Sequence, residues 1–370
     1  MKILLIAGLA DSLVNFRGQL IQSMRAKGYE VHVAAPDMWQ SEASVHTLRA
    51  WGVQLHEAKM DRTGKNPLAD LQTVWELWRL MQKVQPAVVL GYTIKPVIFG
   101  TIAAWLAGVP KRVALITGLG FAFQSERSVM LWIVQKLYAF ALRRAELVFF
   151  QNPDDLALFR ERKILSLDAH TCVVNGSGVD VTYFAEHELP RGGICFLLIA
   201  RLLGAKGVRE YAQAAKIVKA RYPDARFAVV GWIDSNPDAI SQEELDGWLS
   251  MGVLDYWGRM SDVRPAIRKA SVYVLPSYRE GTPRSVLEAM SMGRAVITTD
   301  APGCRETVSH GDNGYLVPVK SVNALAEAMM HFCETPLLVR EMGNRSRSIA
   351  LERYDVHKVN TMMMKEMGIL

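Results

Sequence analysis

Cysteine is scarce in this 370-residue chain, and its four cysteines form no C-x-x-C pair: Cys172, Cys195, Cys304 and Cys333. This wide spacing argues against a disulfide framework and against a zinc site built on paired cysteines, and it fits a reducing cytosol. Long apolar runs are also missing. The longest uncharged stretch, residues 96–110, has 15 residues, whereas a membrane-spanning helix needs about 20. The sequence therefore predicts no transmembrane helix.

Three ligand-binding motifs are absent as well. The chain has no G-x-G-x-x-G, which argues against a dinucleotide-binding dehydrogenase. It has no Asp-x-Asp and no His-x-x-x-His, so it does not offer the grouped carboxylates or paired histidines that hold catalytic metals. We therefore expect no metal and no cofactor.

Positive charge is present but unevenly distributed. The net charge is +6, yet residues 61–145 alone hold 11 Lys or Arg against 4 Asp or Glu, a local charge of +7. No nucleic-acid recognition motif accompanies this excess, which disfavours a nucleic-acid partner. Aromatic and basic side chains instead share the segment 127–144, and Trp75 and Trp78 lie on a second helical segment, 67–84. Such helices suit the surface of an anionic membrane.

This pattern leads us to expect a cytoplasmic protein in peripheral contact with the inner face of the cell membrane. The residues of segment 127–144 that carry the expectation are Trp132, Lys136, Tyr138, Phe140, Arg143 and Arg144. The alternative is a buried crossover helix with charged ends, which would leave the basic region as ordinary solvated surface.

Short apolar runs alternate with helical patterns along the whole chain. The runs predict strands at 2–7, 30–35, 53–57, 87–91, 112–116 and 146–151, and again at 194–200, 226–230, 272–275 and 295–299. Helical periodicity lies between them, at 16–27, 42–51, 67–84, 127–144, 208–220, 285–292 and from 322 onward. Continuous apolar strands are typical of parallel sheets covered on both faces, so an α/β fold with doubly wound sheets is predicted.

The strand pattern restarts after a polar stretch at 183–193, which predicts two Rossmann-like domains. We place the first at 1–185, the second at 186–350, and a final helix at 351–370 that packs back towards the first. Two such sheets that face each other leave a cleft at the carboxyl ends of their strands, where open α/β folds bind ligands.

The segment 277–299 contains the most informative polar residues. A buried strand ends before it, a loop with Gly281 and Pro283 follows, and a helix begins near Ser285. The first turn of that helix would offer backbone N–H groups to a phosphate, and Gly281 permits close approach of a ligand. Glu280 and Glu288 could then accept hydroxyl groups of a sugar. Alternatively, Glu280 is a solvated turn residue and Glu288 only complements the helix dipole.

Glu280 and Glu288 are separated by seven residues, and segment 280–308 resembles the E-x7-E signature of retaining GT-B glycosyltransferases of family four. Further similarities follow the order of the chain: Arg201 and Lys206 match an R-x4-K segment, 178–184 a G-V-D-x-x-x-F segment, and 313–318 a late N-G-x-L-V-x strand. The resemblance covers essentially the whole chain. It implies the GT-B fold, with domain 1–185 binding the acceptor and domain 186–350 binding a nucleotide sugar across the cleft.

The resemblance also implies roles for individual residues. Arg201 and Lys206 would bind the donor diphosphate, since two preplaced cations stabilise the charge of a departing nucleoside diphosphate and make a metal unnecessary. Glu280 would contact hydroxyls of the transferred sugar, Glu288 those of the ribose, and Gly281 and Thr282 would offer backbone amides. The leaving phosphate would take the acceptor's proton, so the two glutamates are not an acid–nucleophile pair. The alternative is that Arg201 is an ordinary surface arginine and Lys206 an ordinary lysine at the start of a helix.

The first domain offers fewer candidates. The loop expected at 8–18 follows the first strand and includes Asn15, a candidate donor contact. Lys95 is a candidate for the acceptor diphosphate, and Gly118 and Gly120 would permit close backbone approach; the alternative for Lys95 is a solvated helix-start lysine. Some relatives carry a histidine in this region that assists the sugar, and this chain has none here.

Segments 231–258 and 276–289 are most similar to a subgroup that extends undecaprenyl-diphosphate-linked sugars with an N-acetylhexosamine, including bacillosaminyl-diphospho-undecaprenol α-1,3-N-acetylgalactosaminyltransferases. We therefore expect transfer from a UDP-sugar to a polyprenyl-diphosphate-linked glycan in bacterial surface glycan or glycoprotein assembly. One alternative is a family-four transferase with another donor, such as GDP-mannose, in capsule, O-antigen or exopolysaccharide synthesis. The others are a degenerate GT-B binding protein and a GT-B sugar epimerase.

Overall fold

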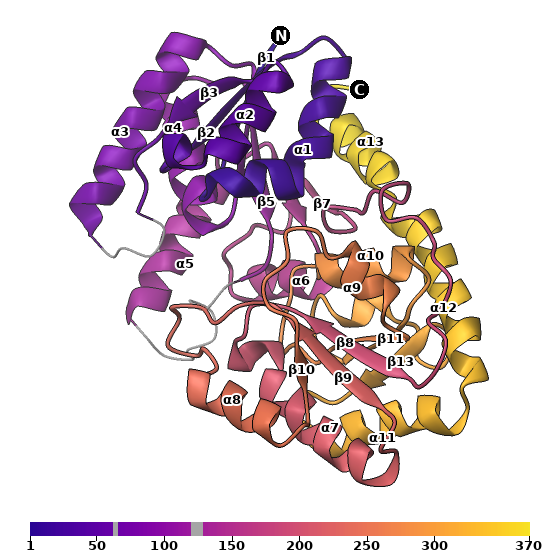
Figure 1. The fold of residues 1–370 in the computed structure, drawn as a ribbon. Helices are drawn as coiled ribbons and strands as arrows, with labels where there is room; N and C mark the ends of the chain where they lie inside the picture. Colours follow the sequence, from indigo (N-terminus) through magenta and orange to yellow (C-terminus); the bar gives the residue numbers. More distant parts are fainter. Residues whose placement is uncertain (62–65, 120–128) are drawn as a thin grey trace. The chain divides into compact units, whose positions relative to one another are not determined.

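The computed structural model describes residues 1–61, 66–119 and 129–370. Two compact units make up the chain: unit 1 comprises Met1–Ser177 with Val359–Leu370, and unit 2 comprises Gly178–Lys358. Helices flank the sheet in each unit (Figure 1). Among the described residues, no helix combines the length and the apolar character needed to cross a bilayer. The four cysteines are free.

Unit 1 contains a parallel sheet of seven strands in the order β3-β2-β1-β4-β5-β6-β7. Its strands are β1 (Lys2–Ile6), β2 (Glu30–Ala35), β3 (Gln54–Glu57), β4 (Val88–Tyr92), β5 (Lys111–Ile116), β6 (Leu147–Phe150) and β7 (Thr171–Val173). Its helical segments are α1 (Ala10–Ala26), η1 (Met38–Gln40), α2 (Glu42–Ala50), α3 (Pro67–Val84), η2 (Pro96–Gly100), α4 (Thr101–Leu106), α5 (Val129–Leu142) and α6 (Pro153–Glu161).

Both faces of the unit 1 sheet are buried, which explains its continuous apolar strands. On β1, Ile3 and Leu5 pack in a core with α1, α2 and the C-terminal helix α13 (Val356–Glu366), whereas Leu4 and Ile6 pack against α3 and α4. Helices α5 and α6 cover the neighbouring part of that second face. Because successive side chains of a strand point to opposite faces of the sheet, β1 contributes residues to two cores.

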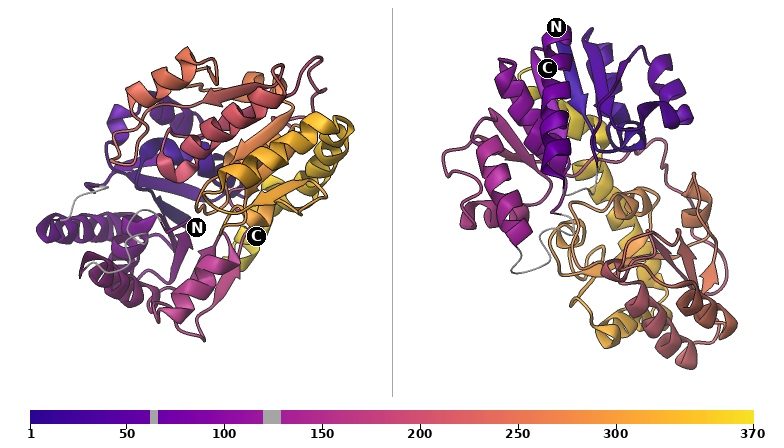
Figure 2. Two further views of the ribbon diagram at one scale, coloured as in Figure 1. Left: turned by 90° about the horizontal axis from the view of Figure 1, so that it is seen from below. Right: turned by 90° about the vertical axis from the view of Figure 1, so that its left-hand side faces the viewer.

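Unit 2 repeats the arrangement with a parallel sheet of six strands in the order β10-β9-β8-β11-β12-β13. Its strands are β8 (Cys195–Ile199), β9 (Arg226–Val230), β10 (Asp255–Tyr256), β11 (Val272–Leu275), β12 (Ala295–Thr299) and β13 (Gly314–Val317). Its helical segments are η4 (Gly204–Lys206), α7 (Val208–Arg221), α8 (Gln242–Ser250), α9 (Arg264–Arg268), α10 (Arg284–Ser291), η5 (Arg305–Thr307), α11 (Val322–Glu334), α12 (Leu337–Ile349) and η6 (Ala350–Tyr354). Figure 2 shows helices on both sides of this sheet.

The two doubly wound sheets confirm the predicted fold class, and the cleft expected between them stays a prediction. The boundary between the units follows Ser177, whereas the sequence pattern placed it near residue 185. Contacts with α12 and α10 account for the difference, because Arg347 donates a hydrogen bond to the carbonyl of Val181 at 3.1 Å and the Ser291 hydroxyl donates to the carbonyl of Phe184 at 2.7 Å. Buried Arg294 likewise donates to the carbonyls of His187 and Glu188 at 2.8 and 3.1 Å. The polar stretch at 183–193 is thereby held by unit 2.

The start of α1 corrects one expectation of the sequence. We expected a loop over 8–18 and a helix from 16, but α1 begins at Ala10. Leu13, Arg17 and Leu20 are buried at helical spacing. The buried arginine concealed this pattern in the sequence; its guanidinium lies 5.2 Å from the ring centre of Tyr92.

Candidate active site

The candidate site of unit 2 lies at the carboxyl ends of its two central strands, β8 and β11. These strands are neighbours, yet the chain continues from β8 towards β9 on one side and from β11 towards β12 on the other. This is the topological switch point at which open α/β sheets bind ligands. Arg201 and Lys206 follow β8, and Glu280, Gly281 and Thr282 follow β11.

The turn after β8 is held in place by the loop that follows β9. The carboxylate of Asp238 accepts a hydrogen bond from the N–H of Ala205 at 2.7 Å. Its backbone carbonyl accepts one from the N–H of Gly204 at 2.8 Å. Gly207 then adopts a positive φ of +72°, and a Cβ atom there would lie 2.2 Å from the carbonyl oxygen of Pro276. Only glycine fits this position, so the turn that presents Lys206 is set by backbone geometry.

The loop after β11 is attached to this same turn. The carbonyl of Ala205 accepts hydrogen bonds from the N–H of Tyr278 at 2.9 Å and from the hydroxyl of Ser277 at 3.2 Å. The N–H of Glu280 donates to the carbonyl of Pro302 at 2.9 Å. Both ends of the loop are therefore fixed before any ligand arrives.

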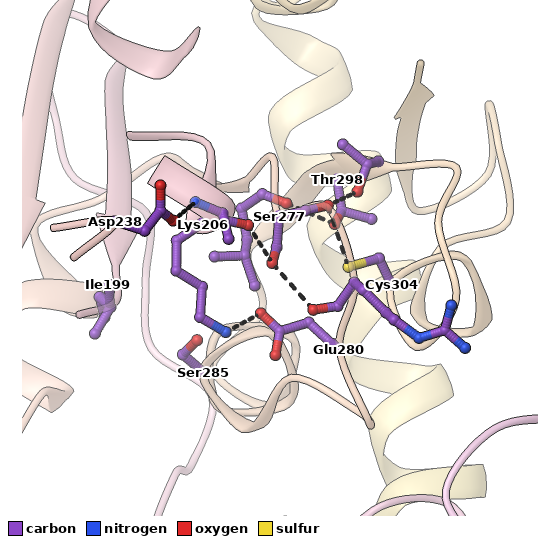
Figure 3. A network of polar contacts seen from close by, with 12 residues as sticks. Ile199, Lys206, Asp238, Ser277, Glu280, Ser285, Thr298 and Cys304 are labelled. Atoms are coloured by element: carbon purple, nitrogen blue, oxygen red, sulfur yellow. Dashed lines mark hydrogen bonds and ion pairs between the residues drawn. The ribbon is translucent and has the colours of Figure 1, made fainter. Parts of the chain in front are cut away.

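This arrangement brings Lys206 and Glu280 together. Their side chains point toward one another and form an ion pair, although 74 positions separate them in the sequence (Figure 3). Both are only partly buried, with 21 % and 15 % of the side chain exposed, so an incoming ligand can reach them. The ammonium group can bind a phosphate, and the carboxylate can accept hydroxyl groups beside it.

Arg201 has a different partner, Asp234 on the loop after β9. Its Nη1 lies 3.0 Å from the Oδ2 of that carboxylate. Sequence reasoning assigned no role to Asp234 or Asp238. A signal was present, since both lie in a polar segment directly after the buried strand β9, and the carboxyl ends of parallel strands share one edge of the sheet.

Glu288 lies inside α10 and is 8 % exposed. Its carboxylate forms an ion pair with Arg284, one turn earlier, at 2.8 Å. Burial raises the pKa of Glu288 to about 6, and Arg284 opposes that rise. The group is therefore ionised at neutral pH but close to its titration range, unlike a solvated glutamate.

The candidates of unit 1 follow the carboxyl ends of its strands. Asn15 is exposed on α1 and not in a loop. Lys95 is 16 % exposed and forms an ion pair with Asp70 of α3 at 2.6 Å, so it is not a solvated lysine. Gly118 follows β5 with a φ of +111°. Gly120 lies outside the described residues.

No group of three or more His, Cys, Asp or Glu side chains gathers as a metal cluster in the part of the chain that the structure describes. In the candidate site, the side chains of Arg201 and Lys206 are cations that could neutralise a phosphate.

Two family models match the chain. A glycosyl transferase 4-like model matches residues 2–152, and a model of the glycosyl transferases of group 1 matches residues 194–335. Between them they span most of both units.

Individual relatives agree with these models. The chain is 27 % identical to an N,N'-diacetylbacillosaminyl-diphospho-undecaprenol alpha-1,3-N-acetylgalactosaminyltransferase of Campylobacter jejuni, over 96 % of this chain and 95 % of the relative. It is also 27 % identical to a UDP-Gal:alpha-D-GlcNAc-diphosphoundecaprenol alpha-1,3-galactosyltransferase of Escherichia coli, over 73 % and 72 % of the two chains. The crystal structure of Anabaena HepE in complex with UDP superposes with a TM-score of 0.80 and covers 100 % of both chains at 17 % identity.

The solved structure supports the fold alone, and the family models and relatives supply the rest. The two doubly wound sheets, the loops at the switch point of unit 2 and the matched models agree: the chain is a glycosyltransferase of the GT-B fold, with a glycosyl transferase 4-like domain in unit 1 and a domain of the glycosyl transferases of group 1 in unit 2.

Proposed function

We propose that this protein transfers an N-acetylhexosamine from a UDP-sugar to a polyprenyl-diphosphate-linked glycan, with retention of anomeric configuration and without a metal ion. The observation that carries the proposal is the Lys206–Glu280 ion pair at the switch point of unit 2, with Arg201 on the same strand end. A cation and a carboxylate side by side match the diphosphate and the sugar hydroxyls of one donor molecule.

The substrate class rests on the relatives. The Campylobacter and Escherichia enzymes are both named for undecaprenyl-diphosphate-linked acceptors, and the Escherichia enzyme for a UDP-sugar. The Campylobacter enzyme transfers an N-acetylhexosamine and aligns over nearly the whole chain. These names favour bacterial surface glycan or glycoprotein assembly as the setting.

The chemistry follows from the charges in the site. The bond between the anomeric carbon and the phosphate oxygen breaks, and Lys206 and Arg201 stabilise the negative charge that develops on the departing UDP. The acceptor hydroxyl attacks from the same face, and its proton passes to the leaving phosphate oxygen, which gives retention. Glu280 and Glu288 act as hydrogen-bond acceptors, because each is already an ionised partner of a cation, Lys206 or Arg284.

A donor screen tests the proposal. The purified protein is incubated with a short-chain polyprenyl-diphosphate glycan and with UDP-, GDP- or dTDP-sugars, with and without EDTA, and mass spectrometry detects the lipid-linked product. We expect a mass increase of one N-acetylhexosamine with a UDP donor, unchanged by EDTA. Product from GDP-mannose alone would favour the alternative donor class, and no product from any donor would favour a binding protein.

We further propose that unit 1 contacts an anionic membrane through the outer face of α3 and α5. On α3, Leu68, Leu71 and Trp75 form an exposed apolar stripe at helical spacing, and the Arg79 guanidinium lies 4.7 Å from the Trp75 ring centre. Exposed apolar stripes are rare on surface helices and indicate an interaction site.

Helix α5 presents a second stripe of exposed aromatic and basic side chains. Trp132 and Phe140 are exposed along it, Lys136 lies over the Trp132 ring at 5.6 Å, and Arg144 lies over the Phe140 ring at 3.6 Å. Aromatic rings at the headgroup level with cations beside them match an anionic bilayer surface.

Co-sedimentation with vesicles tests this contact. We expect binding to phosphatidylglycerol vesicles at low salt and little binding to phosphatidylcholine vesicles. The double variant Trp132→Ser/Phe140→Ser should lose most of it, and the control Leu337→Ser, at an exposed leucine on α12, should not. Equal binding to both vesicle types, or none to either, would contradict the proposal.

A further inference from the structure

A half-exposed tryptophan stands on the same edge of the unit 2 sheet as Arg201, and no role has been given to it. Trp232 lies two residues after the end of β9, and 39 % of it is exposed. Its carbonyl accepts a hydrogen bond from the N–H of Leu202 at 2.9 Å, and Leu202 pairs with Ile233 in a parallel bridge. The register therefore places Trp232 beside Arg201.

The indole ring of Trp232 is held firmly on one side. The guanidinium of Arg259 lies 4.6 Å from the ring centre. The residue before it, Gly231, donates its N–H to the carbonyl of Gly258 at 3.0 Å and accepts a hydrogen bond from the Tyr256 hydroxyl at 2.9 Å. The backbone that carries the ring is thus fixed, a cation lies over the ring, and more than a third of the residue is open to solvent.

The loop that carries Arg259 packs against α10, because Met260 and Val263 share a hydrophobic cluster with Leu287, the neighbour of Glu288. Glu288 is the residue proposed for the ribose hydroxyls, so the ribose contact and the Trp232–Arg259 pair border one loop. The strand register also places Arg201, proposed for the diphosphate, next to Trp232.

We infer that Trp232, backed by Arg259, is the stacking platform for the nucleobase of the donor; the inference rests on the proposed nucleotide-sugar donor. A base is planar, as an indole ring is, and base–aromatic stacking is favourable for every base because each has a π-face. A cation on the opposite face of the indole ring is attracted to its π-system and helps to hold the ring in place. Arg201 and Trp232, on the ends of two neighbouring strands, would then take the diphosphate and the base of one nucleotide.

Calorimetric titration with UMP, UDP and a UDP-sugar tests the inference on the full chain. We expect Trp232→Leu to weaken the binding of all three ligands by a similar factor, on the order of 5- to 100-fold. Trp232→Phe should weaken their binding much less. The KM of Trp232→Leu for the UDP-sugar should rise by a similar factor. Trp75→Leu is a matched control, because Trp75 also lies under an arginine but belongs to α3.

Two results would overturn the inference. One is that Trp232→Leu binds UMP as tightly as the Trp75→Leu control. The other is that it loses affinity for the UDP-sugar but not for UMP, which would assign the ring to the sugar. If Trp232→Leu does not fold, acrylamide quenching of the wild type and Trp232→Phe replaces it: saturating UDP should reduce the quenching difference between the two proteins, and an unchanged difference would refute stacking.

The wild type separates this inference from the proposed function. If the wild-type protein binds none of UDP, GDP and dTDP, the nucleotide-sugar donor itself is wrong. If it binds UDP and Trp232 makes no difference, only the platform is wrong.

Discussion

At the scale of single residues, the site is a set of charges that are already paired before a donor arrives. Three ion pairs make up this set: Lys206 with Glu280, Arg201 with Asp234, and Arg284 with Glu288. A donor diphosphate must share the two cations with these carboxylates. The pairing keeps the cations oriented without the cost of leaving a partly buried charge alone.

Lys206 is the most direct test of this view. We expect Lys206→Ala to lower kcat by about 10²-fold or more, because it removes a preplaced cation from the departing diphosphate. Lys219→Ala is the control, since Lys219 lies on α7 nearby in sequence and donates to the carbonyl of Gly252 at 2.6 Å. Single-turnover transfer assays measure both. Near-normal turnover in Lys206→Ala would remove the proposed electrostatic role.

Glu288 yields a prediction about pH and stability. Burial raises its pKa from the ordinary value of 4.5 to about 6, so between these pH values the folded state binds more protons than the unfolded state. Stability contributed by this group therefore falls as pH rises through the window.

Glu288→Gln removes this dependence. The free energy of unfolding of the variant, relative to wild type, should increase by about 2 kcal/mol between about pH 4 and about pH 7.5. Urea unfolding curves at each pH measure it. A difference that is flat with pH would show that Arg284 compensates the burial of the carboxylate completely.

At the scale of secondary-structure elements, Gly207 joins β8 to α7 and sets the direction of Lys206. A Cβ atom there would meet the carbonyl of Pro276, whereas at Gly252, also at positive φ, no atom lies within 4 Å. Gly252→Ala should lower the free energy of unfolding by about 1–2 kcal/mol, because an alanine disfavours the left-handed backbone conformation there. Gly207→Ala should cost more and also lower turnover at least about tenfold, through displacement of Lys206.

Thermal unfolding and transfer assays on the two variants separate these effects. Equal losses of stability, or full activity in Gly207→Ala, would show that the turn adapts to a side chain.

The elements that could be predicted from the sequence are those buried on both faces. The run at 194–200 became β8, and the runs at 272–275 and 295–299 became β11 and β12 over the same residues. Strands β7 and β10 escaped notice because they have three and two residues and are only partly buried. Their strand structure comes from pairing with β6 and β9, which local patterns do not encode.

The site divides in the same way. Arg201, Lys206 and Glu280 were placed at strand ends because each follows an apolar run. Asp234 and Trp232 were missed, since their relevance depends on β9 lying beside β8, a fact of strand order and not of spacing. The loop expected around Asn15 was wrong because buried Arg17 interrupts an otherwise apolar helix face.

At the scale of the whole molecule, the two units carry different kinds of surface. Unit 2 holds the groups proposed to bind phosphate and sugar hydroxyls, while the local charge of +7 and the exposed stripes of α3 and α5 belong to unit 1. The net charge of +6 for the whole chain does not reveal that the positive excess lies in unit 1. Each ligand class should therefore change the behaviour of one unit only.

Hydrogen–deuterium exchange with two ligands tests the division. Saturating UDP should slow exchange at 201–207 and 276–290, because the ligand occupies the two loops of the switch point. Phosphatidylglycerol vesicles should slow exchange in α3 and α5 and leave those loops unchanged, and this protection should disappear at about 1 M salt, where the screening length falls to about 3 Å. UDP protection should survive better, because its partners are partly buried. Protection of α3 and α5 by UDP alone would contradict the division, as would vesicle protection confined to unit 2.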